Sequence, residues 1–124
     1  MNPSEQLLAE RAIAQVLQRY AHLADERDWA AIGEVFSDEA QADYGGLHLG
    51  DRAAIAAMLA RHLGGCGPTQ HLLGIPVVAF DGDRASSRVA VRAAHRGVGG
   101  QAEVTYECMG EYHDHWVRTA QGWR

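Results

Sequence analysis

The sequence predicts one α+β domain in which a strongly curved sheet wraps around three helices that come first in the chain. Before Pro68, apolar residues recur at three- and four-residue spacing after capping residues, which is typical of helices. After Pro68, apolar and polar residues alternate in runs separated by turns, which is typical of strands. A chain of 124 residues can bury a core in one domain and is too short for two, so a single domain over 1–124 is expected.

Three helices are expected in the first half. The first begins after Ser4 as its N-cap and carries a long apolar stripe. The stripe consists of Leu8, Ala12, Ile13, Val16, Leu17, Tyr20 and Ala24. Asp28 caps a short second helix over 29–36, and Asp51 caps a third over 52–63, which ends at a glycine-rich segment.

A strand, turn and strand are expected over residues 39–49, around a Gly-Gly pair. Neighbouring strand residues point to opposite faces, so only one of Asp43 and Tyr44 faces the interior. Tyr44 shares its face with Ala42, and the apolar face is the one expected to be buried. Tyr44 is therefore predicted to point inward.

Long strands are expected over residues 69–80, 84–96 and 101–118. Each has one mostly apolar face, as expected when that face covers a core or a cavity. In the last two strands this face holds Val89, Val91, Ala93 and His95, followed by Val104, Tyr106, Cys108, Gly110 and Tyr112. A further strand begins in the C-terminal Gly-Trp-Arg, and we expect it to be truncated or incomplete.

The composition argues against some classes of partner. The net charge is −5, and all the positive side chains are arginines spread along the chain, so a basic face for nucleic acid is not expected. No apolar run approaches the ~20 residues that cross a bilayer, and no signal-peptide pattern is present. We therefore expect a cytoplasmic protein without a membrane partner. Cys66 and Cys108 lack zinc-type spacing and are expected to be free thiols.

Four polar residues stand out against apolar surroundings. His71 begins a strand rich in leucine, isoleucine and valine, and His95 ends the apolar face of the next strand. Tyr44 points inward, and Asp25 lies near the end of the first helix. A carboxylate fixes the tautomer of a nearby imidazole and raises its basicity, and a phenol can donate to a substrate oxygen. Together they predict an acid–base site that removes a proton next to a carbonyl, with no metal and no cofactor.

Each of these residues also has a structural explanation. His71 fits a hydrogen-bonded residue at a strand start, and Asp25 fits a cap of the second helix. Tyr44 and Tyr20 fit the core, and His95 fits a half-exposed strand end. Only the combination favours a site.

A rival constellation is Glu111, His113 and His115, which alternate along one strand face. Two histidines and a carboxylate can bind a divalent metal ion. That face is otherwise polar and lies opposite the apolar one, so a solvated strand face is the favoured interpretation.

The sequence resembles the SnoaL-like branch of the nuclear-transport-factor-2-like superfamily over essentially its whole length. The resemblance rests on "QRYAHLADERDWAAIGEVFSDEAQADY", the capped third helix, "TQHLLG", the long strands and a closing "GW". It implies a cystatin-like α+β barrel, a cone in which a curved, mixed or antiparallel sheet and three helices enclose a deep pocket. It also implies a homo-oligomer, either a trimer or a dimer.

The closest functional pattern in that superfamily is scytalone dehydratase. Asp25 is similar to its aspartate through "D-x-x-D-W", Tyr44 to its tyrosine through "DY", and His71 to its main histidine through "TQH". His95 is similar to its second histidine, on the following strand. Bile-acid dehydratase and hexachlorocyclohexane dehydrochlorinase share the Asp25–His71 pair, and bile-acid dehydratase also has a tyrosine where Tyr20 stands.

The chain departs from the scytalone enzyme at two positions. Ala24 stands where a second pocket tyrosine is expected, and Tyr112 or a neighbour stands where an asparagine is expected. Scytalone itself is therefore not the expected substrate. The resemblance implies a cofactor-independent, dehydratase-like lyase for a small hydrophobic, cyclic or polyketide-like molecule.

The resemblance also implies a role for each site residue. His71 takes the proton, and Asp25 orients and stabilises its imidazolium form. Tyr44, together with Tyr20, holds the carbonyl oxygen directly or through a water, and His95 assists the leaving hydroxyl. The expected substrate-binding residues are Tyr20, Val91, Cys108 and Tyr112.

Other functions stay open from the sequence. A ketosteroid-isomerase-like isomerase or a polyketide cyclase would use Tyr20 as oxyanion donor and Asp43 as proton shuttle, with Asp114 as the nearest candidate for a second donor. Strand alternation turns Asp43 outward, and this alternative leaves His71 without a role. A non-catalytic small-ligand-binding module and an assembly protein that pairs subunits through its open sheet face are further alternatives.

Overall fold

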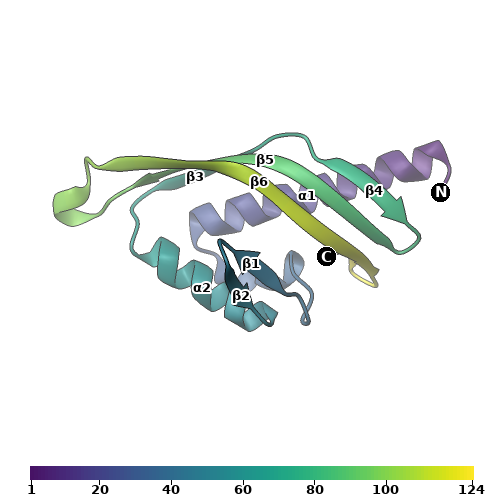
Figure 1. Cartoon of the computed structure of the whole chain (residues 1–124), viewed down its shortest axis with the longest axis horizontal. Coiled ribbons are helices and arrows are strands. Elements are labelled where there is room, and N and C mark those ends of the chain that lie inside the picture. Colours follow the sequence, from purple (N-terminus) through teal and green to yellow (C-terminus); the bar gives the residue numbers. More distant parts are fainter.

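The computed structural model describes residues 1–124 and places the helices on one side of a curved sheet (Figure 1). Helix α1 (Pro3–Glu26) leads through the 3-10 helix η1 (Trp29–Glu34) into a hairpin of β1 (Ala42–Tyr44) and β2 (Leu47–Leu49). Helix α2 (Arg52–Gly64) follows the hairpin. The predicted α+β class, with three helices and a strongly curved antiparallel sheet, is confirmed.

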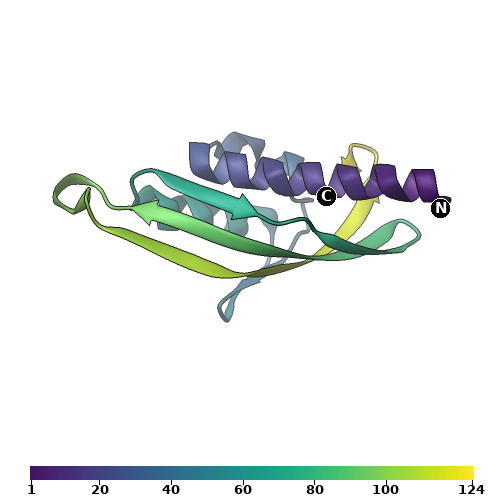
Figure 2. The same cartoon turned by 90° about the horizontal axis from the view of Figure 1, so that it is seen from above.

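The main sheet follows α2 and is antiparallel throughout. It contains β3 (Thr69–Leu73), β4 (Val77–Asp81), β5 (Arg84–Arg96), β6 (Thr105–Thr119) and β7 (Gly122–Trp123), with the 3-10 helix η2 (Gly99–Gln101) between β5 and β6. The strand order is β3–β5–β6–β7, and β4 also pairs with β5. Strands β5 and β6 arch over the helices (Figures 1 and 2), so the concave face of the sheet looks toward them.

The start of α1 differs from the prediction. Asn2, not Ser4, is the N-cap: its side chain accepts from the main-chain N–H of Glu5 at 2.9 Å, and the Glu5 carboxylate accepts from the N–H of Asn2 at 2.9 Å. This reciprocal pair satisfies two N–H groups that a helix start leaves unpaired. The buried stripe begins at Ala9. Leu8 lies about 100° further around the helix and is 69% exposed.

Three other predicted boundaries were wrong. The expected strand over 69–80 is divided into β3 and β4 at Gly74–Pro76, because proline has no N–H to give to the ladder. The second helix is a 3-10 helix that ends at Glu34. The last long strand begins at Thr105, after η2, so residues 101–104 of the predicted strand lie outside the sheet.

The core lies between α1, α2 and the concave face of the sheet. Ile13 and Ile55 come from the two helices and Val89 from β5, and all three are buried. The buried indole of Trp116 donates to the hydroxyl of Ser87 at 2.8 Å, which satisfies both polar groups. No helix is both long and apolar enough to span a bilayer. The single-domain organisation and the incomplete last strand stay predictions.

The outer face of the sheet carries rows of opposite charge. Arg88 and Glu111 lie 3.7 Å apart, and Arg96 and Glu103 lie 3.6 Å apart. These are exposed ion pairs, which contribute little to stability. The same face also exposes Leu72 and Met109. The expected homo-oligomer stays a prediction.

Candidate active site

A carboxylate–imidazole pair forms the centre of the candidate site. Asp25 lies in the last turn of α1, and His71 lies at the middle of β3. His71 Nδ1 and Asp25 Oδ1 are 2.6 Å apart, and the two side chains are 8% and 20% exposed. The fold therefore joins residues from the first helix and the main sheet at one sheltered point.

The Asp25 carboxylate accepts three hydrogen bonds. Its Oδ1 accepts from the Thr69 hydroxyl at 3.0 Å and from the ring of His71, and its Oδ2 accepts from the main-chain N–H of His71 at 2.9 Å. This environment assigns the proton of the neutral imidazole to Nδ1. Nε2 then keeps its lone pair, which is what a general base requires.

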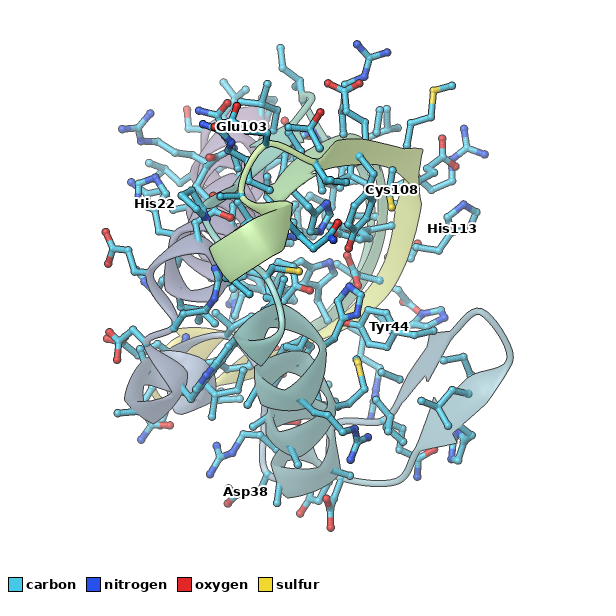
Figure 3. The ribbon with its side chains drawn as sticks, turned by 90° about the vertical axis from the view of Figure 1, so that its left-hand side faces the viewer. His22, Asp38, Tyr44, Glu103, Cys108 and His113 are labelled. Atoms are coloured by element: carbon cyan, nitrogen blue, oxygen red, sulfur yellow. The ribbon has the colours of Figure 1, made fainter.

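Two phenols meet beside the pair. Tyr44 lies between the hairpin and the curved sheet (Figure 3) and is half-buried, whereas Asp43 is exposed, as strand alternation predicts. The hydroxyls of Tyr44 and Tyr20 are 3.4 Å apart, and the Tyr20 ring packs edge-on against His71. Burial raises the pKa of both phenols. Both therefore stay protonated at neutral pH and can donate to an oxygen.

Strand β6 adds Tyr112 and Asp114 to this cluster. The Tyr112 ring meets Tyr20 edge-on, with 5.7 Å between centroids, and burial raises the pKa of Tyr112 to about 12. Asp114 follows on the same face, opposite the buried Ser87, and burial raises the pKa of its carboxyl group. Sequence reasoning gave Asp114 no part in the favoured site. Strand alternation places it on the same face as Tyr112, but its burial depends on elements elsewhere in the chain.

His95 lies on β5, the strand next to the one that carries His71. It is 4% exposed, whereas a half-exposed position was one of the expectations. Its ring stacks on Tyr106 with 4.3 Å between centroids and meets His71 edge-on at 6.0 Å. Its Nδ1 is buried without a hydrogen-bond partner. Burial, followed by the neighbouring His71 and His62, lowers the pKa of His95, so this ring is neutral at neutral pH.

The expected lining residues differ in how far they are covered. Val91 and Tyr112 are half-buried, but Cys108 is exposed. Figure 3 shows Cys108 on the concave side of the sheet and His113 on the other side. The apolar face predicted for β6 is therefore on the correct side of the sheet, but the first half of the strand is exposed. Alternation along a strand determines which side of the sheet a side chain points to, but it does not determine whether another part of the chain covers that side chain.

The alternative constellations lie on outer surfaces. Asp43 contacts His48 at 3.1 Å, and both side chains are mostly exposed. Glu111 contacts His113 at 2.6 Å on the solvated face of β6. No group of three or more His, Cys, Asp or Glu side chains is placed to hold a metal ion.

A hollow at one end of the sheet is lined by Thr69, His95 and Tyr106 together with the outward-facing Gln70, Arg96 and Glu107. Neither Asp25 nor His71 lines it; its link to the pair is the hydrogen bond from Thr69 to Asp25. A second hollow follows the outer surface of α1, along Arg11 and Arg19, and does not border the pair.

Comparison with known proteins assigns the family. The family model described as "SnoaL-like domain" matches residues 5–124. The chain belongs to the SnoaL-like domain family. Among curated relatives, this SnoaL-like domain is 36% identical over 115 residues to the uncharacterized protein Rv2910c of Mycobacterium tuberculosis, covering 90% of this chain and 77% of that one.

Solved structures similar to this SnoaL-like domain share its fold over nearly the whole chain. The Kfla4162 protein of Kribbella flavida has a TM-score of 0.88 and 27% identity, covering 96% of this chain and 86% of that one. A protein of Novosphingobium aromaticivorans described as NTF2-like with a cystatin-like fold has a TM-score of 0.79 and 28% identity, covering 97% and 79%. Another from that species, named provisionally as a scytalone dehydratase, has a TM-score of 0.86 and 21% identity, covering 96% and 80%.

In this SnoaL-like domain, Asp114→Asn is expected to raise the free energy of unfolding at neutral pH. The folded-state pKa of Asp114 is raised, so the stability that this group contributes is present below its unfolded pKa and is lost as pH rises through the folded pKa. The amide keeps the shape without the buried charge. Urea unfolding at about pH 7 and about pH 4 measures the gain, which should shrink at the lower pH.

The matched control is Asp81→Asn, because Asp81 is exposed at the end of β4. This variant should change the free energy of unfolding little at either pH. An Asp114→Asn protein that is less stable than the wild type at neutral pH would contradict the prediction.

Proposed function

We propose that this SnoaL-like domain is a cofactor-independent lyase that eliminates water from a hydrophobic, cyclic or polyketide-like β-hydroxy carbonyl compound. The observation that carries the proposal is the 2.6 Å contact between Asp25 Oδ1 and His71 Nδ1, sheltered beside a group of phenols. A SnoaL-like fold, with a structural neighbour named provisionally as a scytalone dehydratase, supports a general ligand-binding or dehydratase-like role.

The first step of the proposed reaction is removal of a proton from the carbon next to the carbonyl. Nε2 of His71 forms the new N–H bond, and the electron pair of the C–H bond moves to give an enolate. Asp25 stabilises the resulting imidazolium through Nδ1. Tyr44 and Tyr20 donate to the enolate oxygen, and their raised pKa values keep them in the donor form.

The second step is loss of the hydroxyl group. The enolate electrons form the carbon–carbon double bond as the carbon–oxygen bond breaks, and the departing oxygen takes the proton back from the imidazolium of His71. The products are an unsaturated carbonyl compound and water, and the pair returns to its starting state. His95, which is neutral, assists by hydrogen-bonding to the leaving oxygen. The edge-on contact of its ring with His71, with 6.0 Å between centroids, supports this role.

An isomerase or polyketide cyclase is the second candidate. It is favoured by the adjacent hydroxyls of Tyr20 and Tyr44, since two neutral phenol donors suit a dienolate oxygen. This alternative would use Asp43 as its proton shuttle. Asp43 is exposed and paired with His48, which argues against that role. The fold also suits a small hydrophobic ligand that is bound without reaction.

The test uses two model ketones. The β-hydroxy derivative of α-tetralone gives α-naphthol on loss of water, and α-tetralone itself reports proton removal by deuterium uptake from heavy water. The lyase proposal expects wild-type protein to accelerate both reactions and Asp43→Asn to behave like the wild type. Deuterium uptake without elimination, or loss of activity in Asp43→Asn, would favour the isomerase. The absence of both reactions with bound ketone would favour a binding module.

A further inference from the structure

The end of α1 that supplies Asp25 also supplies an arginine that reaches toward the pair. Arg27 is the C-cap residue, with a left-handed backbone at φ 60°. Its side chain folds back across the helix end, where Nη1 donates to the carbonyl oxygens of Ala24 at 2.9 Å and Asp25 at 3.0 Å. Nη2 donates to the carbonyl oxygen of Gly67 at 2.7 Å. Arg27 thus ties the helix end to the segment that leads into β3.

One further contact of Arg27 continues to the carboxylate. Nη1 also donates to the Thr69 hydroxyl oxygen at 2.9 Å, and that hydroxyl donates to Asp25 Oδ1 at 3.0 Å. A guanidinium has only donors, so Thr69 must accept from Arg27. The single hydrogen of its hydroxyl is then left for Asp25. The two hydrogen bonds therefore run in one direction: Arg27 donates to the Thr69 hydroxyl, and the Thr69 hydroxyl donates to the Asp25 carboxylate.

We propose that Arg27 and Thr69 are positioning residues that hold the Asp25 carboxylate in the orientation that keeps the His71 proton on Nδ1. The carboxylate has two oxygens, and two rotatable bonds join it to its helix position. The main-chain N–H of His71 donates to Oδ2, and the Thr69 hydroxyl donates to Oδ1, which also accepts from the imidazole. Without the Thr69 hydroxyl, Oδ1 keeps only the ring of His71 as its partner.

This inference deepens the proposed function, and the effect that it expects on kcat rests on that function. The effect that it expects on the tautomer of His71 does not, because the tautomer can be measured without substrate. Proton–nitrogen correlation spectra of labelled protein distinguish Nδ1–H from Nε2–H in a neutral imidazole.

The decisive comparison is Thr69→Val against Thr69→Ser. Valine keeps the branched shape and removes the hydroxyl, whereas serine keeps the hydroxyl. We expect the Nδ1–H form of His71 in the wild type and in Thr69→Ser, and a substantial Nε2–H population in Thr69→Val. In the α-naphthol assay, Thr69→Val should lose about tenfold in kcat with KM nearly unchanged, and Thr69→Ser should restore it.

Three outcomes would overturn the inference. A folded Thr69→Val protein with a wild-type His71 tautomer would do so, and so would equal tautomer changes in the valine and serine variants. If Thr69→Val does not fold, Arg27→Met provides the test, because the Thr69 hydroxyl then loses the donor that directs it. A wild-type tautomer in that variant would also overturn the inference. If the tautomers change as expected but the wild type produces no α-naphthol, positioning stands and the lyase proposal fails.

Discussion

Asp25→Asn and His71→Gln are each expected to lower kcat for elimination by about 10²–10⁴-fold while the protein remains folded. Glutamine cannot take the proton. Asparagine replaces one acceptor oxygen with an NH₂ group at a point where three donors converge, from Thr69 and from the ring and main chain of His71. Its amide must face another donor or force the imidazole proton onto Nε2, where it blocks the base. The rate of α-naphthol formation measures the loss.

The chain provides a matched control for this substitution. Asp43 and His48 form a second carboxylate–imidazole contact, at 3.1 Å on the exposed hairpin. Asp43→Asn makes the same chemical change there and should leave kcat within about twofold of the wild type, as is usual for surface changes. Near-wild-type elimination by Asp25→Asn or His71→Gln would remove the pair from the mechanism. Circular dichroism and thermal unfolding of each variant would show that the fold is retained.

Tyr44→Phe and Tyr20→Phe are each expected to lower kcat by about 10²–10³-fold, the usual effect of losing one oxyanion donor. Phenylalanine keeps the ring, so the edge-on contacts of Tyr20 with Phe36 and Tyr112 remain. KM should change less than kcat, because the enolate oxygen carries full charge only after proton removal. Steady-state kinetics with the β-hydroxytetralone separate the two parameters.

The double variant tests whether the two phenols act on the same oxygen. Their hydroxyls are 3.4 Å apart, close enough to share one acceptor. The Tyr20→Phe/Tyr44→Phe protein should therefore lose less than the product of the single effects. Deuterium uptake by α-tetralone should fall in parallel with elimination. Unchanged uptake in both single variants would assign the phenols a packing role.

Local patterns in the sequence predicted the elements and the orientation of most site residues. The period of the first helix identified Tyr20 and Ala24 as inward, and both are buried. Alternation turned Tyr44 inward and Asp43 outward, and the Gly-Gly turn has positive φ at both residues. These predictions succeed because a side chain's face is fixed by the period of its own helix or strand.

Two kinds of site feature could not be predicted from local patterns. Asp114 was passed over because a carboxylate two residues from a tyrosine acquires its raised pKa only from the elements that bury it. The exposure of Cys108 likewise depends on how far the rest of the chain covers the first half of β6. Burial is a property of what lies across the sheet, and strand alternation carries no information about it.

The sequence alone determined the order of helices and strands and supplied a carboxylate at residue 25 and an imidazole at residue 71. Only the tertiary structure decided that these groups meet at 2.6 Å and that Arg27 and Thr69 lie behind them. The reason is that Asp25 and Thr69 are 44 positions apart. Contact between them requires the curvature of the sheet and the packing of α1 against β3, which arise from long-range contacts and not from periodicity along the chain.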